Sequence, residues 1–156
     1  DVSFADDALM TVIGPEASVI HEDRIKTDPD AYAEATRTQL ETGFALPATA
    51  YVRAQRYRRH LGSRLQTAMS GLDAIVTPTV PWTAPAENPP LDDPEGAAEM
   101  RYIAPYNLTG LPALTVPCGV AGDGLPIGFQ IAGRPNRDAE LLALGQALEP
   151  VLQRSV

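Results

Sequence analysis

The chain has 156 residues, of which 44% are hydrophobic and 21% are charged. A chain of this length can bury about 68–70% of its unfolded surface, so this composition excludes a disordered chain and favours one domain. The formal net charge of -8 disfavours nucleic acid and anionic membrane surfaces as partners, because both would repel an acidic protein.

Membrane insertion and secretion have no support in the sequence. No apolar run approaches the roughly 18 residues that a membrane-spanning helix needs, and Asp1, Asp6 and Asp7 stand where a signal peptide would be basic. Cys118 is the single cysteine, so the sequence provides no internal disulfide and no cysteine cluster for a metal. These features predict a cytoplasmic protein with no cofactor and no membrane partner.

Prolines mark the expected helix starts in the first third of the chain. Pro15 precedes the run from Glu16 to Ile25, and Pro29 heads the next segment, which together predict two short helices.

A longer helix is predicted to begin near Pro47, because apolar residues recur from there at spacings of three and four. Gly71 suits a left-handed cap at the end of this helix. The arginine-rich face is expected to be solvated, with docking to RNA, calmodulin or a membrane as the alternative. The expected buried positions are Ala50, Ala54, Tyr57, Leu61, Leu65, Ala68 and Leu72.

The apolar run 72–76 ends before Pro78 and predicts a strand buried on both sides in a parallel sheet. The proline-rich and acidic residues 83–96 are predicted to form a surface loop. Residues 97–109 are expected to form one or two helical turns.

A hairpin is predicted from residues 113–117 and 127–132, joined by the turn Gly122-Asp123-Gly124. Asn136 is expected to cap a closing helix. That helix would face the sheet with Leu141, Leu144, Leu148 and Val151.

This order of elements predicts an α/β fold. Three strands leave two open edges, which natural proteins rarely tolerate, so the sheet is expected to continue in polypeptide outside this chain.

No residue pattern in the chain provides a recognisable nucleophile. The Gly-x-Ser-x-Gly elbow is absent, and a serine without a neighbouring base is a weak nucleophile. His21, Glu22 and Asp23 are adjacent in sequence, so on a helix they point in different directions and do not predict a metal site. Cys118 is expected to be a small buried residue, although a thiol enzyme that pairs it with His21 stays open.

Four motifs occur in a distinctive order: Asp73 to Thr79, Asn107 to Ala113, Val116 to Gly119, and Gly124 to Pro135. Together they strongly resemble the carboxy-terminal part of the amidase signature family. The segment from Glu16 to His21 is similar to that family as well. So is the helix that contains Tyr51, Ala54, Gln55 and Arg58, and the resemblance covers nearly the whole chain.

The resemblance implies a hydrolase of carboxylic amides with a large mixed sheet covered by helices. Residues 1–156 would then be the carboxy-terminal part of a single amidase domain. The family's catalytic triad of a lysine and two serines lies in a glycine- and serine-rich stretch with an upstream lysine. This chain has no Ser-Ser or Gly-Gly pair, and its only lysine, Lys26, lies in no matching motif. The resemblance therefore implies that the triad is outside this chain, which contributes no catalytic residue.

Two segments are the candidate walls of a substrate cleft. The first follows the carboxyl end of a predicted buried strand, where α/β sheets usually bind ligands. The second contains Asn107, whose amide is expected to bond nearby backbone, and Gly110, for which we expect a positive φ. The candidate substrate-binding residues are Thr77, Pro78, Thr79, Tyr106, Asn107, Gly110 and Leu111.

The expected substrate is a small-molecule amide. In the glutamine-hydrolysing relatives, the resemblance places an acidic residue seven positions before the asparagine, where this chain has Met100. A thioether cannot pair with an ammonium group, which favours a general or apolar amide over glutamine. The expected macromolecular partner is the missing amino-terminal half, or a second copy of the chain. The alternative function is a non-catalytic module that holds a catalytic partner.

Overall fold

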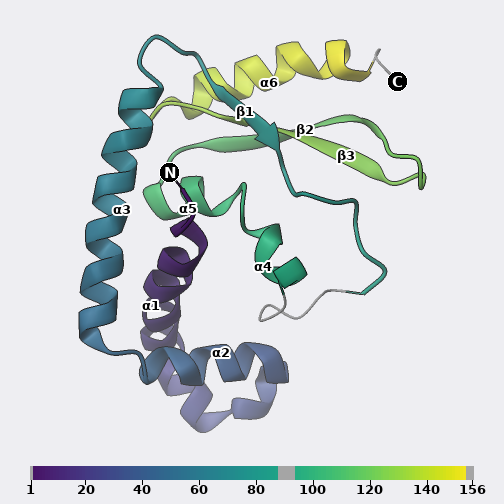
Figure 1. The fold of residues 1–156 in the computed structure, drawn as a ribbon. Coiled ribbons are helices and arrows are strands. Elements are labelled where there is room, and N and C mark those ends of the chain that lie inside the picture. The colour runs from purple at the N-terminus through teal and green to yellow at the C-terminus, as the bar shows by residue number, and fades with distance from the viewer. Residues whose placement is uncertain (1, 88–93, 154–156) are drawn as a thin grey trace.

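The computed structural model describes residues 2–87 and 94–153. A helical part and a sheet part make up the structure, and α3 runs alongside α1 from α2 at one end to the sheet at the other (Figure 1). The elements are α1 (Ala5–Thr27), the 3-10 helix η1 (Pro29–Ala31), α2 (Glu34–Phe44), α3 (Ala48–Ala68), β1 (Ile75–Pro78), α4 (Pro94–Glu99), α5 (Ala104–Thr109), β2 (Ala113–Val120), β3 (Pro126–Ala132) and α6 (Asp138–Gln153).

Helix α1 is longer than the sequence predicts. It begins at Ala5, and Pro15 lies inside it rather than ahead of it, so the prediction of a short helix over 16–25 was wrong at its start. An interior proline costs about 3 kcal/mol in an isolated helix. Here the turns before Pro15 bury apolar residues against α3 and α5, which offsets that cost: Ala5, Ala8, Leu9 and Val12.

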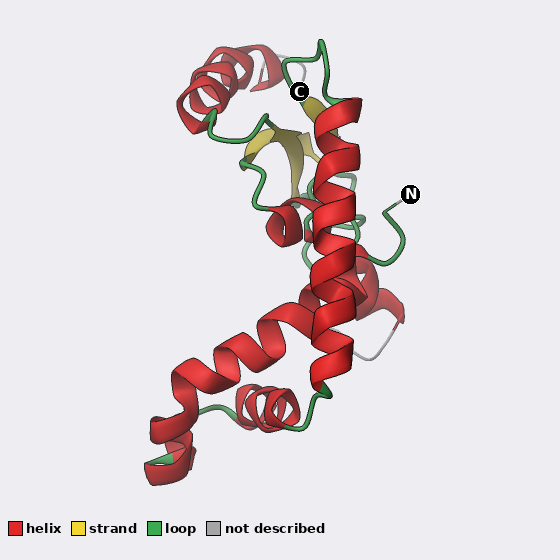
Figure 2. Ribbon diagram, turned by 90° about the vertical axis from the view of Figure 1, so that its left-hand side faces the viewer, coloured by secondary structure: helices red, strands yellow, loops and turns green. Residues whose placement is uncertain are grey.

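The second predicted helix also begins later than expected. Pro29 heads the 3-10 turn η1, and α2 follows only from Glu34. The buried hydroxyl of Ser18 ties α2 to α1, because its Oγ donates a hydrogen bond of 2.7 Å to the Leu40 carbonyl. Figure 2 shows α2 lying against the later turns of α1, at the end of the molecule away from the sheet.

Helix α3 confirms the predicted apolar face in its middle. Ala54 and Leu61 are buried against α1 and α5, and Tyr57 and Leu65 are partly buried there. The prediction was wrong at its end, because the helix stops at Ala68 and Leu72 lies beyond it with 47% of its surface exposed. Gly71 has the expected left-handed conformation, with φ of 78°.

The sheet has the strand order β1-β3-β2, and both pairings are antiparallel. The predicted parallel strand over 72–76 is therefore wrong in bounds and in partner. Val76 is 56% exposed, because β1 is an edge strand and α6 packs over β2 and β3 instead. A short apolar run fits an antiparallel edge strand as well as a buried parallel one.

The predicted hairpin is confirmed as β2 and β3, with an irregular register between Pro117 and Gly119. Asn136 does not cap α6: it has φ of 59° and lies two residues before the helix begins at Asp138. Asn136 lies in the turn that leads into the helix. Its backbone is left-handed there, a conformation that asparagine tolerates.

Helix α6 covers one face of the sheet. Leu141 is buried, Leu144 and Leu148 are half-buried, and Val151 is 60% exposed, so the predicted inward face ends before Val151. The α/β fold class is confirmed, with three strands among the described residues and an unpaired outer edge on both β1 and β2.

Part of the predicted surface loop 83–96 falls outside the described residues. Residues 83–87 belong to no helix or strand, residues 88–93 are not described, and α4 begins at Pro94. Within the described ranges, no helix is both long enough and apolar enough to cross a membrane.

Candidate functional site

The candidate site is built on a polar row across the sheet. Thr77 on β1 and Thr115 on β2 are both register partners of Gln130 on the central strand β3. Residues directly opposite one another share a face of an antiparallel sheet. Helix α6 packs on the other face, where Gly145 lies beside Leu114 and Ile131. The side chains of the polar row therefore lie on the face of the sheet opposite to α6, which is the face toward the helical part.

Gln130 joins three segments that are distant in sequence. Its side-chain Nε2 donates one hydrogen bond of 2.9 Å to Thr77 Oγ1 on β1 and another of 2.9 Å to the carbonyl of Tyr102, which precedes α5. Only 3% of Gln130 is exposed, and a buried amide is costly unless it is hydrogen-bonded. These bonds hold the sheet against the start of α5.

Tyr106 of α5 lies at the same junction. It is buried, with Leu111, in a cluster that includes Met69 and Ala132. Burial raises the pKa of the Tyr106 phenol above its ordinary value, and hydrogen bonding by Thr77 opposes the rise. The structure thus brings the predicted residues Thr77 and Tyr106 together, with Tyr106 and Leu111 as core residues beneath the surface.

Thr79 belongs to a second contact at the end of β1. Its hydroxyl lies 3.0 Å from that of Thr115, and its backbone N–H donates to the Gly128 carbonyl. A Cβ at position 128 would come within 2.6 Å of the Thr79 hydroxyl, so only glycine fits there without a shift. Pro78, between the two threonines, is exposed.

Asn107 and Gly110 lie on the outer side of α5. The expectation that the Asn107 amide bonds nearby backbone was wrong: the residue is exposed, and within the described residues its side chain has no hydrogen-bond partner. It is an exposed residue of the helix here, with its backbone N–H bonded to the Ile103 carbonyl. Gly110 has the expected positive φ, 73°, as the cap of α5.

A groove of about 650 Å³ adjoins this site. Pro78 and Gly128 form its border with the polar row, Trp82 contributes an aromatic side wall, and Glu99 is a charged member of its lining. The loop on one side is tied to the hairpin turn, because Thr83 Oγ1 donates a hydrogen bond of 2.6 Å to Asp123 Oδ2. This bond is the main cause of the lowered pKa of Asp123, followed by the bond from the Leu125 backbone N–H.

Met100 stands at the position where the glutamine-hydrolysing relatives were expected to carry an acidic residue. Its side chain packs, partly buried, against the helical core cluster. The position thus provides apolar packing in this chain.

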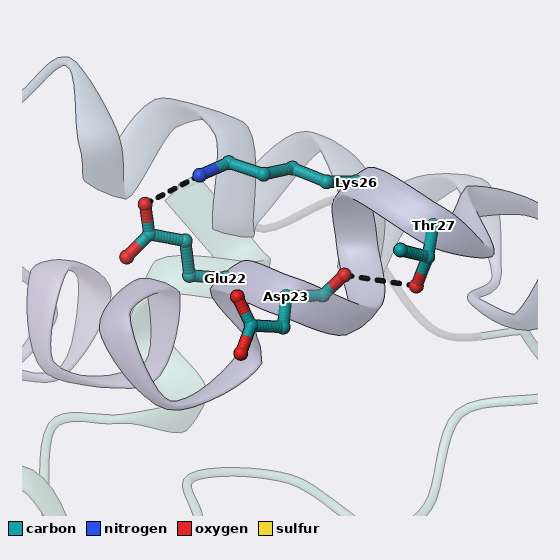
Figure 3. Close-up of polar contacts among 4 residues, drawn as sticks. All are labelled: Glu22, Asp23, Lys26 and Thr27. Carbon is teal, nitrogen blue, oxygen red and sulfur yellow. Dashed lines mark hydrogen bonds and ion pairs between the residues drawn. The ribbon is translucent and has the colours of Figure 1, made fainter.

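The only lysine is far from this junction and is engaged elsewhere. Lys26 Nζ lies 2.6 Å from Glu22 Oε1 near the end of α1, and the adjacent Thr27 bonds the Asp23 carbonyl (Figure 3). The hydrogen bond with Glu22 raises the pKa of Lys26 further above neutrality. A lysine that acts as a general base needs the opposite shift.

Cys118 and His21 do not form a pair. Cys118 Sγ lies 3.5 Å from the Ile127 carbonyl within the hairpin, whereas His21 Nδ1 lies 3.0 Å from the Tyr32 hydroxyl in the helical part. Among the described residues, no group of three or more histidine, cysteine, aspartate or glutamate side chains is placed to hold a metal ion. The thiol enzyme hypothesis therefore loses its base.

Gln130 and Tyr102 are the site residues that sequence reasoning missed. One signal was available, because Gln130 is a polar residue among apolar neighbours in a predicted strand. Tyr102 takes part through its backbone carbonyl, which every residue has, so its side-chain type could not indicate this role.

Comparison with known proteins gives a consistent result. The family model described as Amidase matches residues 8–142. A fatty acid amide hydrolase of Medicago truncatula is 39% identical over 77% of this chain and 21% of its own length. An amidase of Pseudomonas putida is 33% identical over 86% of this chain and 30% of its own length.

A solved structure agrees with these relatives. A crystal structure of an amidase matches with a TM-score of 0.80 and 29% identity, covering 94% of this chain and 35% of that one. The chain spans 21% and 30% of the lengths of the two curated relatives above.

Proposed function

The chain belongs to the amidase family, and from this premise we propose that it forms the carboxy-terminal part of a hydrolase that cleaves the C–N bond of a carboxylic amide. The match of the family model over residues 8–142 carries the proposal. The polar junction between β1, β3 and α5 is where this chain would contribute to the substrate site.

The chemistry that we propose is acyl transfer through a serine. A neutral lysine accepts a proton through an intermediate serine, the second serine attacks the amide carbonyl, and the C–N bond breaks as the amine leaves with a proton. Water then hydrolyses the acyl-serine ester to the carboxylic acid. The lysine and serines would lie in polypeptide outside this chain, because Lys26 is bound to Glu22 and the sequence has no Ser-Ser pair and no Gly-x-Ser-x-Gly elbow.

The role of this chain would be to form one wall of the substrate cleft. Thr77, Pro78 and Thr79 supply hydroxyl and apolar contacts at the end of β1. Asn107 offers a carboxamide that is exposed and can both donate and accept hydrogen bonds, as an amide substrate requires. The packed, half-buried Met100 supports a general or apolar amide as the substrate class.

We further propose that the catalytic segment covers an open edge of the sheet. Edge strands attract further strands because their backbone groups are unpaired, and both β1 and β2 are edges within the described residues. Self-association of the chain would be the alternative way to cover these edges. The cytoplasmic location and the lack of a cofactor stay predictions.

The test compares the chain alone with the chain joined to an upstream segment that carries a glycine- and serine-rich motif. The probes are benzamide and para-nitroacetanilide. We expect turnover only from the joined protein, with the isolated chain at the level of a heat-treated control. Turnover by the isolated chain that Cys118→Ser abolishes would establish the thiol enzyme instead. A joined protein that folds but hydrolyses neither probe would favour the non-catalytic module.

A further inference from the structure

We propose that Gln130 is a positioning residue of this amidase-type site, which fixes the end of β1 relative to α5 and sets the direction of the Thr77 hydroxyl. The inference rests on the proposed function. It assigns a role to a buried residue that contacts the candidate wall through the Thr77 hydroxyl.

The orientation of the Gln130 amide follows from its partners. The Tyr102 carbonyl can only accept a hydrogen bond, so the group 2.9 Å from it is the Gln130 Nε2 and not Oε1. The second N–H of the same nitrogen is then directed at Thr77 Oγ1, also 2.9 Å away. Thr77 must accept this bond, which leaves its own proton to donate elsewhere.

Tyr106 of α5 lies beside this hydroxyl. Hydrogen bonding by Thr77 lowers the pKa of the Tyr106 phenol against the larger effect of burial. Gln130 on β3 and Thr77 on β1 therefore meet α5 at the same point.

The cost of burying Gln130 supports a role beyond packing. Two neighbours of Gln130 along β3, Ile131 and Ala132, are fully buried apolar residues, and an apolar side chain of similar volume could fill the position without needing partners. What such a side chain could not do is hold Tyr102, and with it α5 and Asn107, at a fixed distance from Thr77. Without that link the two proposed walls would lose the connection between Thr77 and the Tyr102 carbonyl.

The experiment measures amide hydrolysis by the joined protein, with Gln130→Leu and Gln130→Glu as the test variants. Leucine removes both hydrogen bonds, and glutamate keeps the volume but presents only acceptors to Tyr102 and Thr77. We expect kcat/KM for para-nitroacetanilide to fall by about 10- to 100-fold, mainly through kcat, because a displacement of about 1 Å at a site can cost that much. Thr77→Val should cause no further loss in the Gln130→Leu background.

The matched control is Ser18→Ala. Ser18 is the other buried polar side chain of the described residues, and it bonds the Leu40 carbonyl far from the junction. Its loss should lower the thermal midpoint in the same way as the Gln130 variants while leaving kcat/KM unchanged. Equal effects of Ser18→Ala and Gln130→Leu on kcat/KM, at matched stability, would overturn the positioning role.

The two proposals fail in different ways. A wild-type joined protein that folds without hydrolysing amides overturns the proposed function, and the positioning role of Gln130 in catalysis falls with it. An active wild type whose Gln130 variants keep full kcat/KM overturns the positioning role alone. Independent, additive losses from Gln130→Leu and Thr77→Val would also overturn it, because the proposal makes Gln130 act through Thr77.

Discussion

The helical part and the sheet part of this molecule achieve close packing by different means. In the helical part, α1 and α2 approach so closely that Gly43 lies against the backbone of Gly14, and Ser18 bridges the two helices. In the sheet part, the close approaches are made by side-chain ends, such as Leu114 against Gly145. Backbone contacts cannot adjust, whereas side-chain ends can turn. The helical part is therefore the less tolerant of added volume.

The candidate site lies where the two parts meet. Tyr102 and Tyr106 come from the helical side, and Thr77 and Gln130 come from the sheet. Both outer edges of the sheet are unpaired within the described residues, so a segment that covers an edge would contact the sheet part. We therefore expect substitutions in the helical part and in the sheet part to differ in their effects on stability and on function.

The largest effect is expected at the α1–α2 contact. A Cβ at position 43 would collide with Ser18 Oγ and come within 2.5 Å of the Gly14 carbonyl oxygen. Gly43→Ala should therefore destabilise the chain by about 3 kcal/mol, the upper range for overpacking. Urea unfolding followed by circular dichroism measures it.

Gly14→Ala is the matched control for this contact. Its Cβ would lie 3.8 Å from the Gly43 Cα, an ordinary contact, and alanine favours a helix by about 1 kcal/mol over glycine. We expect unchanged or slightly increased stability. Equal losses in both variants would show that the backbone approach at Gly43 is not what limits this part.

A smaller effect is expected at the cap of α5, on the junction itself. Gly110 has φ of 73°, which costs an alanine about 1–2 kcal/mol, although nothing lies within 4 Å of an added Cβ. Gly110→Ala should lose that amount in urea unfolding. Gly122→Ala in the hairpin turn, with equal space and no positive φ, should lose almost nothing. A loss shared by both would point to contacts and not to backbone conformation.

How far the sequence predicts this fold depends on whether the signal is local. The hairpin and the middle of α3 were predicted well, because turn residues and a spacing of three and four act within a few residues. The start of α1 and the pairing of β1 were not. Pro15 is a valid local stop signal that is outweighed by burial of Ala5 and Leu9 against distant helices, and β1 pairs with a strand more than 50 residues away.

For the candidate site, the sequence predicted segments that the structure brings close together but did not predict the bonds that link them, and their contact with a substrate stays a prediction. Thr77 and Tyr106 do lie together, and Gly110 has the expected conformation. Asn107 was expected to bond nearby backbone and is instead exposed. Gln130 was missed because its partners are a hydroxyl 53 positions away and a backbone carbonyl, and no local pattern encodes either.

A still smaller effect is expected in the sheet part at Gly145. A Cβ there would collide with Leu114 Cδ2, but this is the movable end of a side chain, and Ile131 Cδ1 is 3.7 Å away. The gain of about 1 kcal/mol from alanine in a helix should largely offset the repacking, so Gly145→Ala should change stability by less than about 1 kcal/mol. A loss as large as that of Gly43→Ala would contradict the contrast between the two parts.

The smallest effect concerns the exposed bond between Thr83 and Asp123, which ties a loop to the hairpin turn of the sheet part. The Thr83 hydroxyl is the main cause of the lowered pKa of Asp123, so Thr83→Val should raise this pKa toward its ordinary value, and Thr83→Ser should preserve it. Because the pKa is lowered on folding, the bond stabilises the fold above the ordinary aspartate pKa, and this contribution is lost as the pH falls through the folded value. The stability difference between wild type and Thr83→Val should therefore disappear in acid. Carbon NMR titration of the Asp123 carboxyl measures the shift directly, and an identical titration in Thr83→Val would mean that the backbone N–H groups of Leu125 and Asp123 set it.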